Sequence, residues 1–217
     1  MSTPGDAPGT QPTAANVLEW ARKVRAIAQN GLVFTRDEFD RDRYQKLQAL
    51  TDSLVAQELG LPLEEIRSLW KYDDGYITPK VDVRGAVFKD DRVLLVRERS
   101  DGKWSLPGGW VDVNDSPSHA IEREIFEESG FRARAVKLAA LFDRQRHPHP
   151  PSLYHIYKLM FLCELIGGEA AISNETDAIE FFPLSSLPEL SPGRITRGQI
   201  ERMFAHHANR SLPTDFD

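Results

Sequence analysis

The sequence predicts an α/β fold, in which a mixed β-sheet lies between helices and is preceded by a small helical N-terminal subdomain. Over residues 17–70 the apolar residues recur at helical spacing. After Pro79 the pattern changes to short β-branched runs separated by turn residues, which indicate strands. Helices interrupt these strands irregularly, so the sequence favours a mixed sheet over a regular βαβ repetition.

The composition is typical of a cytosolic globular protein. Its 217 residues, 41% of them hydrophobic, suffice for one sizeable domain with an appendage. The single cysteine cannot form an intramolecular disulfide, and no apolar run approaches the ~18 residues of a membrane helix. The net charge of -6, with both signs interspersed, lacks the basic stripe that binds nucleic-acid backbones. We therefore expect a cytoplasmic protein that binds neither membranes nor nucleic acids.

Residues 1–15 are predicted to form a flexible tail, because they are rich in Pro, Gly, Thr and Ala and contain almost no large apolar side chain. The helical subdomain is predicted over residues 16–73. Its first helix begins near Val17, where the helical spacing of apolar residues starts. Gly31 follows the last of these residues and is the expected C-terminal stop.

Two further helices complete the predicted subdomain. Thr35 followed by Glu38 has the spacing of a capping box, which predicts that a second helix opens there. Pro62 occupies a position typical of a helical first turn and predicts a short third helix. Residues 72–79 contain Asp-Gly and Thr-Pro pairs, which indicate a linker to the next domain.

Strands dominate the predicted second domain, residues 80–217. Apolar and β-branched residues over 81–88 and 93–97 flank a turn at Asp90-Asp91. A glycine-rich segment then leads into a helix. Further strands are expected over residues 136–142, 154–165 and 178–182, and a last helix over residues 195–207.

The helix after the glycine-rich segment has well-marked ends. Ser116 is a suitable N-cap, and Pro117 occupies the first helical position. Gly130 occupies the C′ position, where a left-handed residue commonly ends a helix. The ends define the register, which places Ile121 and Ile125 on the side that packs on the sheet.

Three carboxylates share another face of this helix, since Glu124, Glu127 and Glu128 stand at positions i, i+3 and i+4. Like charges at this spacing weaken a helix by ~0.2–0.5 kcal/mol per pair, and by more when they lose water. A run of glutamates is ordinarily a solvated helix face. A divalent cation would instead compensate the repulsion, and carboxylate oxygens favour Mg²⁺ or Mn²⁺. Arg123 can reach Glu127, its i+4 neighbour, and is expected to orient that carboxylate.

The segment from Gly109 to Phe131 resembles the signature of the Nudix hydrolases. That signature has a glycine, five residues, an acid, seven residues, and then Arg-Glu-aliphatic-x-Glu-Glu-x-Gly-apolar, the spacing found here. It is matched by Gly109, Asp115, Arg123, Glu124, Ile125, Glu127, Glu128, Gly130 and Phe131. The family has Glu where this chain has the shorter Asp115. We expect Asp115 to cap the helix or to contact the metal ligands without binding the metal itself.

This resemblance implies a Nudix fold over residues 80–217 and a divalent-metal site within it. The implied ligands are the backbone carbonyl of Gly108 and the carboxylates of Glu124, Glu127 and Glu128. The implied metal is Mg²⁺ or Mn²⁺, which suits such oxygen ligands. The Nudix resemblance therefore implies that the acidic face of this helix binds a metal ion and is not simply a solvated surface.

The reaction that the resemblance implies is attack of water on a diphosphate linkage, aided by the metal. Glu124, Glu127 and Arg123 are the implied catalytic residues of the signature. The general base is either a signature glutamate or a later acid from a loop ahead of the final strand. Glu175 stands in such a loop, and ordinary solvated loop charge is the alternative explanation for it.

The N-terminal helices resemble the extension of some bacterial Nudix proteins, among them CDP-choline and ADP-ribose pyrophosphatases. The resemblance lies in residues 20–23, 27–32 and 75–84. It implies hydrolysis of a nucleoside diphosphate derivative such as CDP-choline to a nucleoside monophosphate and a phosphorylated product. ADP-ribose or another sugar nucleotide is the alternative substrate. A non-catalytic nucleotide-sensing module is the alternative from a different class.

Three residues are candidates for substrate contacts. Arg84 in the first strand would contact a phosphate, unless it forms a surface ion pair. Tyr76 would stack on a base, unless it covers a domain junction. Asp143, beside Arg144 and Arg146, is a candidate contact at the rim of the site.

The first helix also predicts a protein partner. With Trp20, Val24 and Ile27 it has more apolar surface than three short helices can bury among themselves. A second copy of the chain would cover that surface. We therefore expect a homodimer in which the helical subdomain contacts the other chain.

Overall fold

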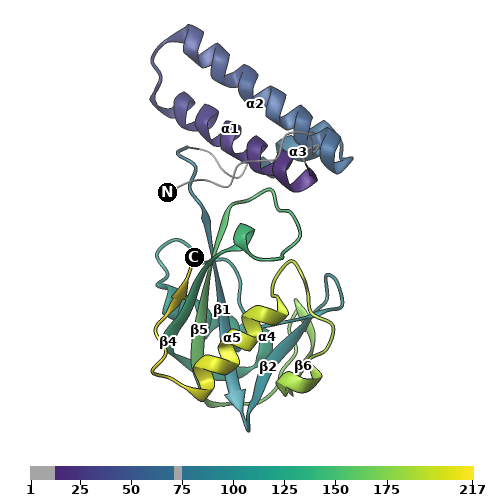
Figure 1. Ribbon diagram of the computed structural model, residues 1–217, viewed down its shortest axis with the longest axis vertical. Coiled ribbons are helices and arrows are strands. Elements are labelled where there is room, and N and C mark those ends of the chain that lie inside the picture. Colours follow the sequence, from purple (N-terminus) through teal and green to yellow (C-terminus); the bar gives the residue numbers. More distant parts are fainter. Residues whose placement is uncertain (1–12, 71–74) are drawn as a thin grey trace, which may run out of the picture. The chain divides into compact units, whose positions relative to one another are not determined.

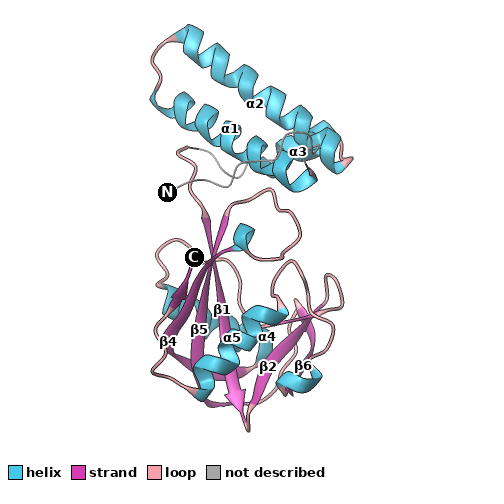
Figure 2. Cartoon of the chain, in the orientation of Figure 1, coloured by secondary structure: helices cyan, strands magenta, loops and turns pink. Residues whose placement is uncertain are grey.

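The computed structural model describes residues 13–70 and 75–217, and its elements are drawn in Figures 1 and 2. Most of the predicted flexible tail, residues 1–12, lies outside the described residues, as do residues 71–73 of the predicted helical subdomain. Among the helices that are described, none is long and apolar enough to cross a membrane.

The chain divides into two compact units. The first extends to Thr78 and also contains Pro151–Tyr154, a short segment from much later in the sequence. The second comprises Pro79–Pro150 and His155–Asp217. The change in sequence character after Pro79 therefore coincides with the boundary between the units.

The described part of the first unit has three helices: α1 (Ala14–Phe34), α2 (Glu38–Leu59) and α3 (Leu63–Trp70). α1 begins earlier than the predicted Val17, because Thr13 and Asn16 form a capping box at its start. The three helices pack through a small apolar core. Its buried members are Leu18, Ala21, Val55, Ile66 and Trp70.

Two predicted boundaries between α1 and α2 are wrong. Gly31 does not end α1, which continues to Phe34 and is capped by Thr35. A Cβ at Gly31 would lie 2.4 Å from the ring of Tyr44, so this glycine allows α1 and α2 to approach closely. The N-cap of α2 is Asp37 and not Thr35, since the Asp37 side chain accepts from the first turn of α2.

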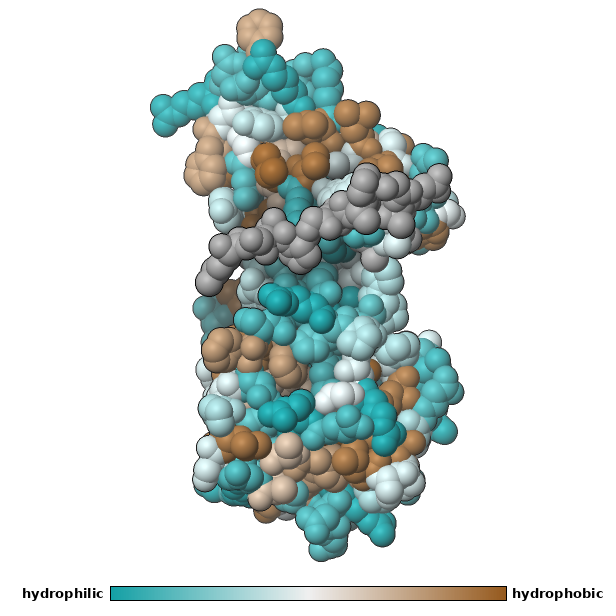
Figure 3. Space-filling view, viewed as in Figure 1, coloured by the Kyte–Doolittle hydropathy of each residue, from teal (hydrophilic) through white to brown (hydrophobic). Residues whose placement is uncertain are grey.

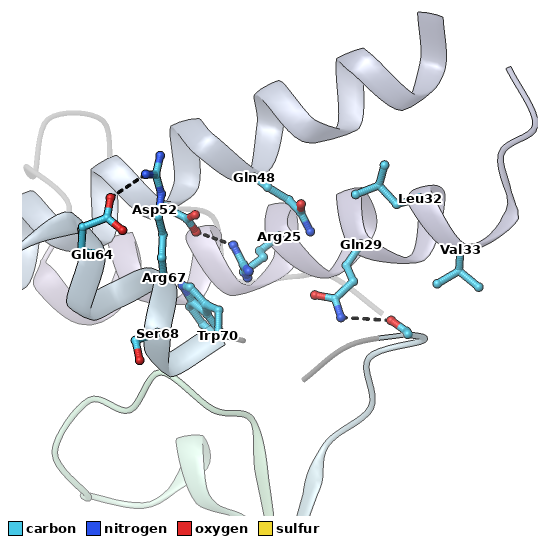
Figure 4. A pocket seen from close by; sticks show the side chains of 11 residues that line it. Arg25, Gln29, Leu32, Val33, Gln48, Asp52, Glu64, Arg67, Ser68 and Trp70 are labelled. Atoms are coloured by element: carbon cyan, nitrogen blue, oxygen red, sulfur yellow. Dashed lines mark hydrogen bonds and ion pairs between the residues drawn. The ribbon is translucent and has the colours of Figure 1, made fainter. Parts of the chain in front are cut away.

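A buried ion pair also lies among the helices of the first unit. Arg25 of α1 binds the Asp52 carboxylate of α2, and its guanidinium lies 4.6 Å from the ring centroid of Trp70 (Figure 4). Gln29 donates to the carbonyl of Gly75 at 3.0 Å. These residues border a cavity of about 600 Å³. Buried polar pairs of this kind specify one packing arrangement more than they add stability.

The segment Pro151–Tyr154 is packed onto the helical unit by side-chain contacts. The Tyr154 hydroxyl donates to the carbonyl of Leu69 at 3.1 Å, and its ring meets that of Trp70 edge to face at 6.2 Å. Leu153 packs on the apolar core of the helices. In the sequence this segment lies between two parts of the second unit, but by its contacts it belongs to the helical unit.

Seven strands form the sheet of the second unit, in the order β3-β2-β1-β5-β4-β7, with β6 paired to β2. They are β1 (Lys80–Lys89), β2 (Arg92–Glu98), β3 (Trp104–Ser105), β4 (Phe131–Asp143), β5 (Ile156–Gly168), β6 (Thr176–Phe182) and β7 (Asp215–Phe216). β1 runs parallel to β5 and β4 runs parallel to β7, whereas the other pairs are antiparallel. The sheet is therefore mixed, as predicted. β3 and β7, with two residues each, are too short for a periodic pattern and were not predicted.

Helices cover both faces of this sheet (Figure 1). The helices of the second unit are α4 (Pro117–Ser129) and α5 (Arg197–Ala208), with the short helices η1 (Arg144–Arg146) and η2 (Leu184–Ser186). Alternate residues of each strand face opposite sides. Val83 of β1 packs with Ile125 of α4, whereas Ala86 of β1 belongs to the core that contains Met203 of α5. The predicted α/β sandwich with a helical N-terminal part is confirmed.

Candidate active site

The helix that carries the acidic cluster, α4, begins and ends where the sequence predicted. The Ser116 side chain caps it by accepting a hydrogen bond from the His119 amide at 3.3 Å. Pro117 follows, and Gly130 ends the helix in the left-handed conformation, with φ of 73°. These ends set the register of α4 and hence the face on which its glutamates lie.

The three glutamates of α4 that were predicted as metal ligands do not share one environment. The side chain of Glu124 is 15% exposed and Glu128 is buried, and both line a cavity of about 450 Å³ in the second unit. The side chain of Glu127 is 54% exposed, and Glu127 is not among the described residues that line this cavity. The cavity therefore receives two of the three carboxylates predicted as metal ligands.

Charged residues of both signs line this cavity. Its glutamates are Glu98, Glu124, Glu128 and Glu175, and its basic residues are Arg84, Arg144, Lys158 and Arg194. The glutamates come from α4, the end of β2 and the loop before β6. The basic residues come from β1, β5, η1 and the loop before α5. Such a cavity can hold a cation and an anion together.

Glu128 is held against the glycine-rich loop. The Gly108 amide donates to Glu128 Oε2 at 3.0 Å. Burial raises the pKa of Glu128 to about 8, and both Arg84 and this hydrogen bond oppose the increase. Gly108 has φ of 138°, and a Cβ there would lie 2.0 Å from the carbonyl oxygen of Val83, so only glycine fits. The carbonyls on both sides of Gly108 accept amide hydrogen bonds from β1. β1 thus fixes the loop beside the α4 carboxylate.

Arg123 links several acids of the signature. Its guanidinium lies 2.9 Å from the Glu127 carboxylate, as the helical spacing predicted, and 3.0 Å from the Glu124 carboxylate. The guanidinium also reaches Asp115 at 3.4 Å. Asp115 is therefore a partner of Arg123, and the helix cap is Ser116 instead. Arg123 can orient two glutamates of α4 at once.

Glu175 lies in the loop before β6 and lines the cavity. The loop is held by its backbone, since the Glu175 amide donates to Ser173 Oγ at 3.1 Å and the Glu175 carbonyl accepts from the Arg99 amide at 2.8 Å. Burial raises the pKa of both Glu98 and Glu124, and the Glu175 carboxylate contributes to both increases. Glu175 is thus close enough to act electrostatically on the other acids.

Arg84 is buried, so the alternative of a surface ion pair is wrong. Its guanidinium binds the buried carboxylate of Asp82, with NH2 at 2.8 Å from Oδ2. Asp82 also binds Lys158, which is 76 residues away in the chain. Glu98 forms an ion pair with Arg194 at 3.0 Å. The sequence did not mark Asp82, Lys158, Glu98 or Arg194 as site residues, because only strand pairing and loop packing bring them together.

Two predicted substrate contacts, Tyr76 and Asp143, are not among the residues that line this cavity. Tyr76 belongs to the helical unit, where its ring meets that of Phe34 at 6.0 Å. Asp143 caps η1 by accepting from the Gln145 amide at 3.0 Å, and it also pairs with His155 at 3.2 Å. These contacts give Asp143 a structural role at the end of β4.

The oxygen donors of the cavity suit a hard divalent cation. Within residues 13–70 and 75–217, no three Asp, Glu, His or Cys side chains are already arranged around one metal position. Glu124 and Glu128 nevertheless present carboxylates to the cavity, and burial raises the pKa of both. A cation would offset the cost of ionising them there, and carboxylate oxygens are the ligands of hard cations.

Known proteins resemble both units of the chain. Residues 15–70 match the family model described as "UDP-X-like, N-terminal oligomerisation domain", and residues 78–204 match the model of the NUDIX domain. The Bacillus subtilis (strain 168) protein named "Putative ADP-ribose pyrophosphatase YjhB" is 42% identical over 200 residues. The match covers 92% of this chain and 96% of that protein.

Two solved structures are also similar. A UDP-X diphosphatase is 33% identical with a TM-score of 0.59, and the match covers 95% of this chain and 100% of that one. An ADP-ribose pyrophosphatase from Streptococcus suis 89-1591 is 38% identical with a TM-score of 0.60, over 64% of this chain and 100% of that one. The chain therefore belongs to the Nudix hydrolases, as a pyrophosphatase that cleaves a diphosphate linkage.

Proposed function

We propose that the protein hydrolyses a nucleoside diphosphate joined to a sugar or an alcohol, and releases a nucleoside monophosphate and a phosphorylated product. The observation that carries this proposal is the cavity lined by acids and bases together. A diphosphate bound with a divalent cation has both charges that such a lining complements. The substrate would therefore bind with its diphosphate, and not its nucleoside, among the buried charges.

ADP-ribose is the substrate that the relatives favour. The Bacillus subtilis relative, which matches nearly the whole chain, is named for ADP-ribose, and so is the Streptococcus suis structure. The family model of the helical part is described as UDP-X-like, which supports a UDP-linked compound as the second candidate. CDP-choline, the first expectation from the sequence, belongs to the same chemical class and stays a prediction.

The acids of the cavity would hold the cation, which we propose to be Mg²⁺ or Mn²⁺. Glu124 and Glu128 would supply carboxylates and Gly108 a backbone carbonyl from the cavity lining. Glu127 does not line the cavity, but it shares Arg123 with Glu124 and would supply a third carboxylate. All of these are hard oxygen donors. A cation bound there acidifies the attacking water and neutralises charge on the leaving phosphate. Arg123 would keep the carboxylates of Glu124 and Glu127 oriented for this role.

Glu175 is the residue that we propose as general base. Its carboxylate lines the same cavity from a loop outside the α4 signature. It would accept a proton from water while the water oxygen bonds to phosphorus and the bond from phosphorus to the bridging oxygen breaks. A Glu175→Gln variant should lose about 100-fold or more in kcat, since general bases contribute 10²–10⁴-fold.

For the nucleotide itself, Trp110 is a further candidate contact. It lines the cavity, its side chain is half-exposed, and it follows the glycine-rich loop directly. Aromatic faces of this kind stack on nucleobases. Tyr76, predicted for this role, belongs to the other unit and stays a prediction.

The test is product analysis by liquid chromatography after incubation with Mg²⁺ and ADP-ribose, a UDP-linked sugar or CDP-choline. We expect nucleoside monophosphate from at least one of them, with ADP-ribose cleaved fastest. Glu127→Gln and Glu128→Gln should each reduce turnover about 100-fold or more without loss of fold, since each removes a ligand charge.

Glu201→Gln is the matched control for Glu127→Gln. Glu201 of α5 pairs with Arg197 four residues earlier at 2.9 Å, the same spacing and distance as the Arg123–Glu127 pair. Its substitution should leave turnover unchanged. If the wild-type protein cleaved none of the three compounds, the proposed substrate class would be wrong. If both α4 variants kept full turnover, the metal assignment would be wrong instead.

We also propose that the protein is a homodimer whose contact is a stripe along α1. Trp20, Ile27 and Phe34 lie along this helix and are 53%, 65% and 70% exposed. Figure 3 shows hydrophobic side chains gathered on the helical unit. The match to an oligomerisation domain supports a second copy of the chain as the group that covers them.

A further inference from the structure

A carboxylate shared by two cations lies on one face of the sheet in the second unit. Asp82 of β1 and Lys158 of β5 are direct partners in the parallel ladder, and Arg84 is two residues along β1, on the same face. Lys158 Nζ lies 2.6 Å from Asp82 Oδ1. Arg84 donates to both Asp82 oxygens, through Nε at 3.1 Å and NH2 at 2.8 Å.

All three side chains are buried, and their charges do not balance. Lys158 is 2% exposed, and Asp82 and Arg84 are 6% and 5% exposed. One carboxylate is hydrogen-bonded to both cations. The Glu98 and Glu128 carboxylates also attract Arg84, but within the described part of the chain neither accepts a hydrogen bond from Lys158. A buried cation of this kind is costly unless an anion compensates it, so Lys158 has room for a further anionic partner. The other acceptors of Arg84 are neutral, the Leu106 carbonyl at 3.2 Å and Ser105 Oγ at 3.4 Å.

The Lys158 ammonium can donate more hydrogen bonds than it makes within the described part of the chain. An ammonium group has three N–H donors, and within the described part of the chain the Lys158 ammonium has one acceptor, Asp82. Lys158 lines the same cavity as Glu124 and Glu128. Burial lowers the pKa of Lys158 to about 8, against the opposing effect of Asp82. The group is thus a buried donor in the lining of the cavity where we propose that the diphosphate binds.

We propose that Lys158 binds a phosphate oxygen of the diphosphate, and that Asp82 is a positioning residue that holds Lys158 and Arg84 side by side. The bound diphosphate supplies a second anionic acceptor to Lys158, through a charge-assisted hydrogen bond. The inference rests on the proposed binding of the diphosphate in this cavity, and it does not depend on which nucleotide is attached.

The first test is calorimetric titration of the full-length protein with inorganic pyrophosphate, in EDTA and again with Mg²⁺. Lys158→Met should bind pyrophosphate about 10- to 100-fold more weakly, the loss expected for one charge-assisted hydrogen bond. Mg²⁺ alone should bind as tightly as to the wild-type protein, because the acids are intact. Unchanged pyrophosphate affinity would overturn the assignment of Lys158.

Two controls separate this role from a structural one. Lys89→Met makes the same change at the exposed end of β1, outside the cavity, and should leave pyrophosphate affinity unchanged. Lys158→Met leaves Asp82 and Arg84 as a balanced pair, so its melting temperature should not fall. A lower melting temperature with full pyrophosphate affinity would mean that Lys158 only supports the fold. Lys158→Arg keeps the charge and should restore part of the affinity.

The positioning role of Asp82 is tested by Asp82→Asn. Removal of a negative charge would by itself strengthen the binding of an anion. If Asp82 instead positions the two cations, its loss should weaken pyrophosphate binding and raise KM more than it lowers kcat. Tighter binding would therefore overturn the positioning role. The two proposals can fail separately. If the protein cleaved no nucleotide of the substrate panel, the proposed substrate class would be rejected. If Lys158→Met still bound pyrophosphate more weakly, the assignment of Lys158 would be supported all the same.

Discussion

The environment of single carboxylates sets the chemistry of this site. Glu127 and Glu128 are neighbours in the sequence, but one is largely in water and the other is buried against the Gly108 amide. Burial raises the pKa of Glu128 to about 8, so at neutral pH this acid is largely protonated until a cation or another charge compensates it. Metal binding and proton release are therefore expected to be linked at Glu128.

The raised pKa of Glu128 predicts the pH dependence of stability in the metal-free protein. The folded state holds a proton that the unfolded state has released, between the ordinary value of 4.5 and the folded value of about 8. The stabilising effect of this proton is complete below pH 4.5, and it is lost as the pH rises through about 8. Urea unfolding in EDTA across this range should show a decrease in unfolding free energy that Glu128→Gln removes.

Comparison between variants isolates this effect from other titrating groups. Burial lowers the pKa of His149 to about 4, so His149 destabilises the fold as the pH falls from 6.5 towards that value. The control Glu201→Gln makes the same substitution in α5, outside the cavity, and tests whether the effect is specific to Glu128. An identical slope in Glu128→Gln and the wild-type protein would show that Glu128 is not the group responsible.

At the level of elements, close approach of two helices explains the glycine of α1. Gly31 has no Cβ, and the space that a Cβ would take is occupied by the ring of Tyr44 from α2. Alanine is a better helix former than glycine by roughly 1 kcal/mol, but overpacking a tight contact costs about 1–3 kcal/mol. The packing effect should exceed the propensity effect at this position.

Gly31→Ala should therefore destabilise the helical unit by about 1–3 kcal/mol, measured by urea unfolding followed by circular dichroism. The double variant Gly31→Ala with Tyr44→Ala should be less destabilised than the sum of the two single changes, because the clash is then absent. Gly198→Ala in α5, where a Cβ meets nothing within 4 Å, should be neutral or slightly stabilising. Additive single changes would show that the contact is not tight.

The elements that build the site are distant from one another in the sequence, and the sheet brings them together. β1 supplies Asp82 and Arg84, the end of β2 supplies Glu98, and the neighbouring β5 supplies Lys158. α4 adds the signature acids on the far side of the glycine-rich loop. A parallel β1–β5 pairing is required for this arrangement, since Asp82 and Lys158 are paired directly only in that register.

On the scale of the whole molecule, the exposed stripe of α1 predicts the oligomeric state. Ile27→Asp should convert a dimer into a monomer in size-exclusion chromatography with light scattering at micromolar concentration, because a charge replaces an apolar contact. Ile166→Asp is the matched control, since Ile166 is 62% exposed in β5 of the other unit, against 65% for Ile27. A wild-type protein that eluted only as a monomer would contradict the dimer.

The chain crosses between the two units more than once, because the segment Pro151–Tyr154 packs with the helices. The residues just before this segment include Arg144, and those just after it include Lys158, both of which line the cavity. Between η1 and β5, which both contribute to the cavity, the chain therefore passes through the helical unit. Its sequence alone, read as a separate helical subdomain, did not indicate this connection.

Local patterns in the sequence determined the elements and the chemistry of the signature. The caps of α4 at Ser116 and Gly130, and the turn between β1 and β2, follow from residues that are neighbours in the chain. The helical spacing that joins Arg123 to Glu127 is likewise local, so the sequence alone predicted it. The same short-range information sufficed to identify the family.

Only the tertiary structure decided which charges share the cavity. Asp82 and Lys158 meet across two strands that are far apart in the sequence, and the buried Glu98 pairs with Arg194, which is also far away in the chain. Gly31 illustrates the limit at a single position, because a glycine after an apolar run can end a helix or admit a neighbouring ring. The choice depends on what packs there, and packing is set by contacts between residues distant in the chain, which spacing along one segment does not encode.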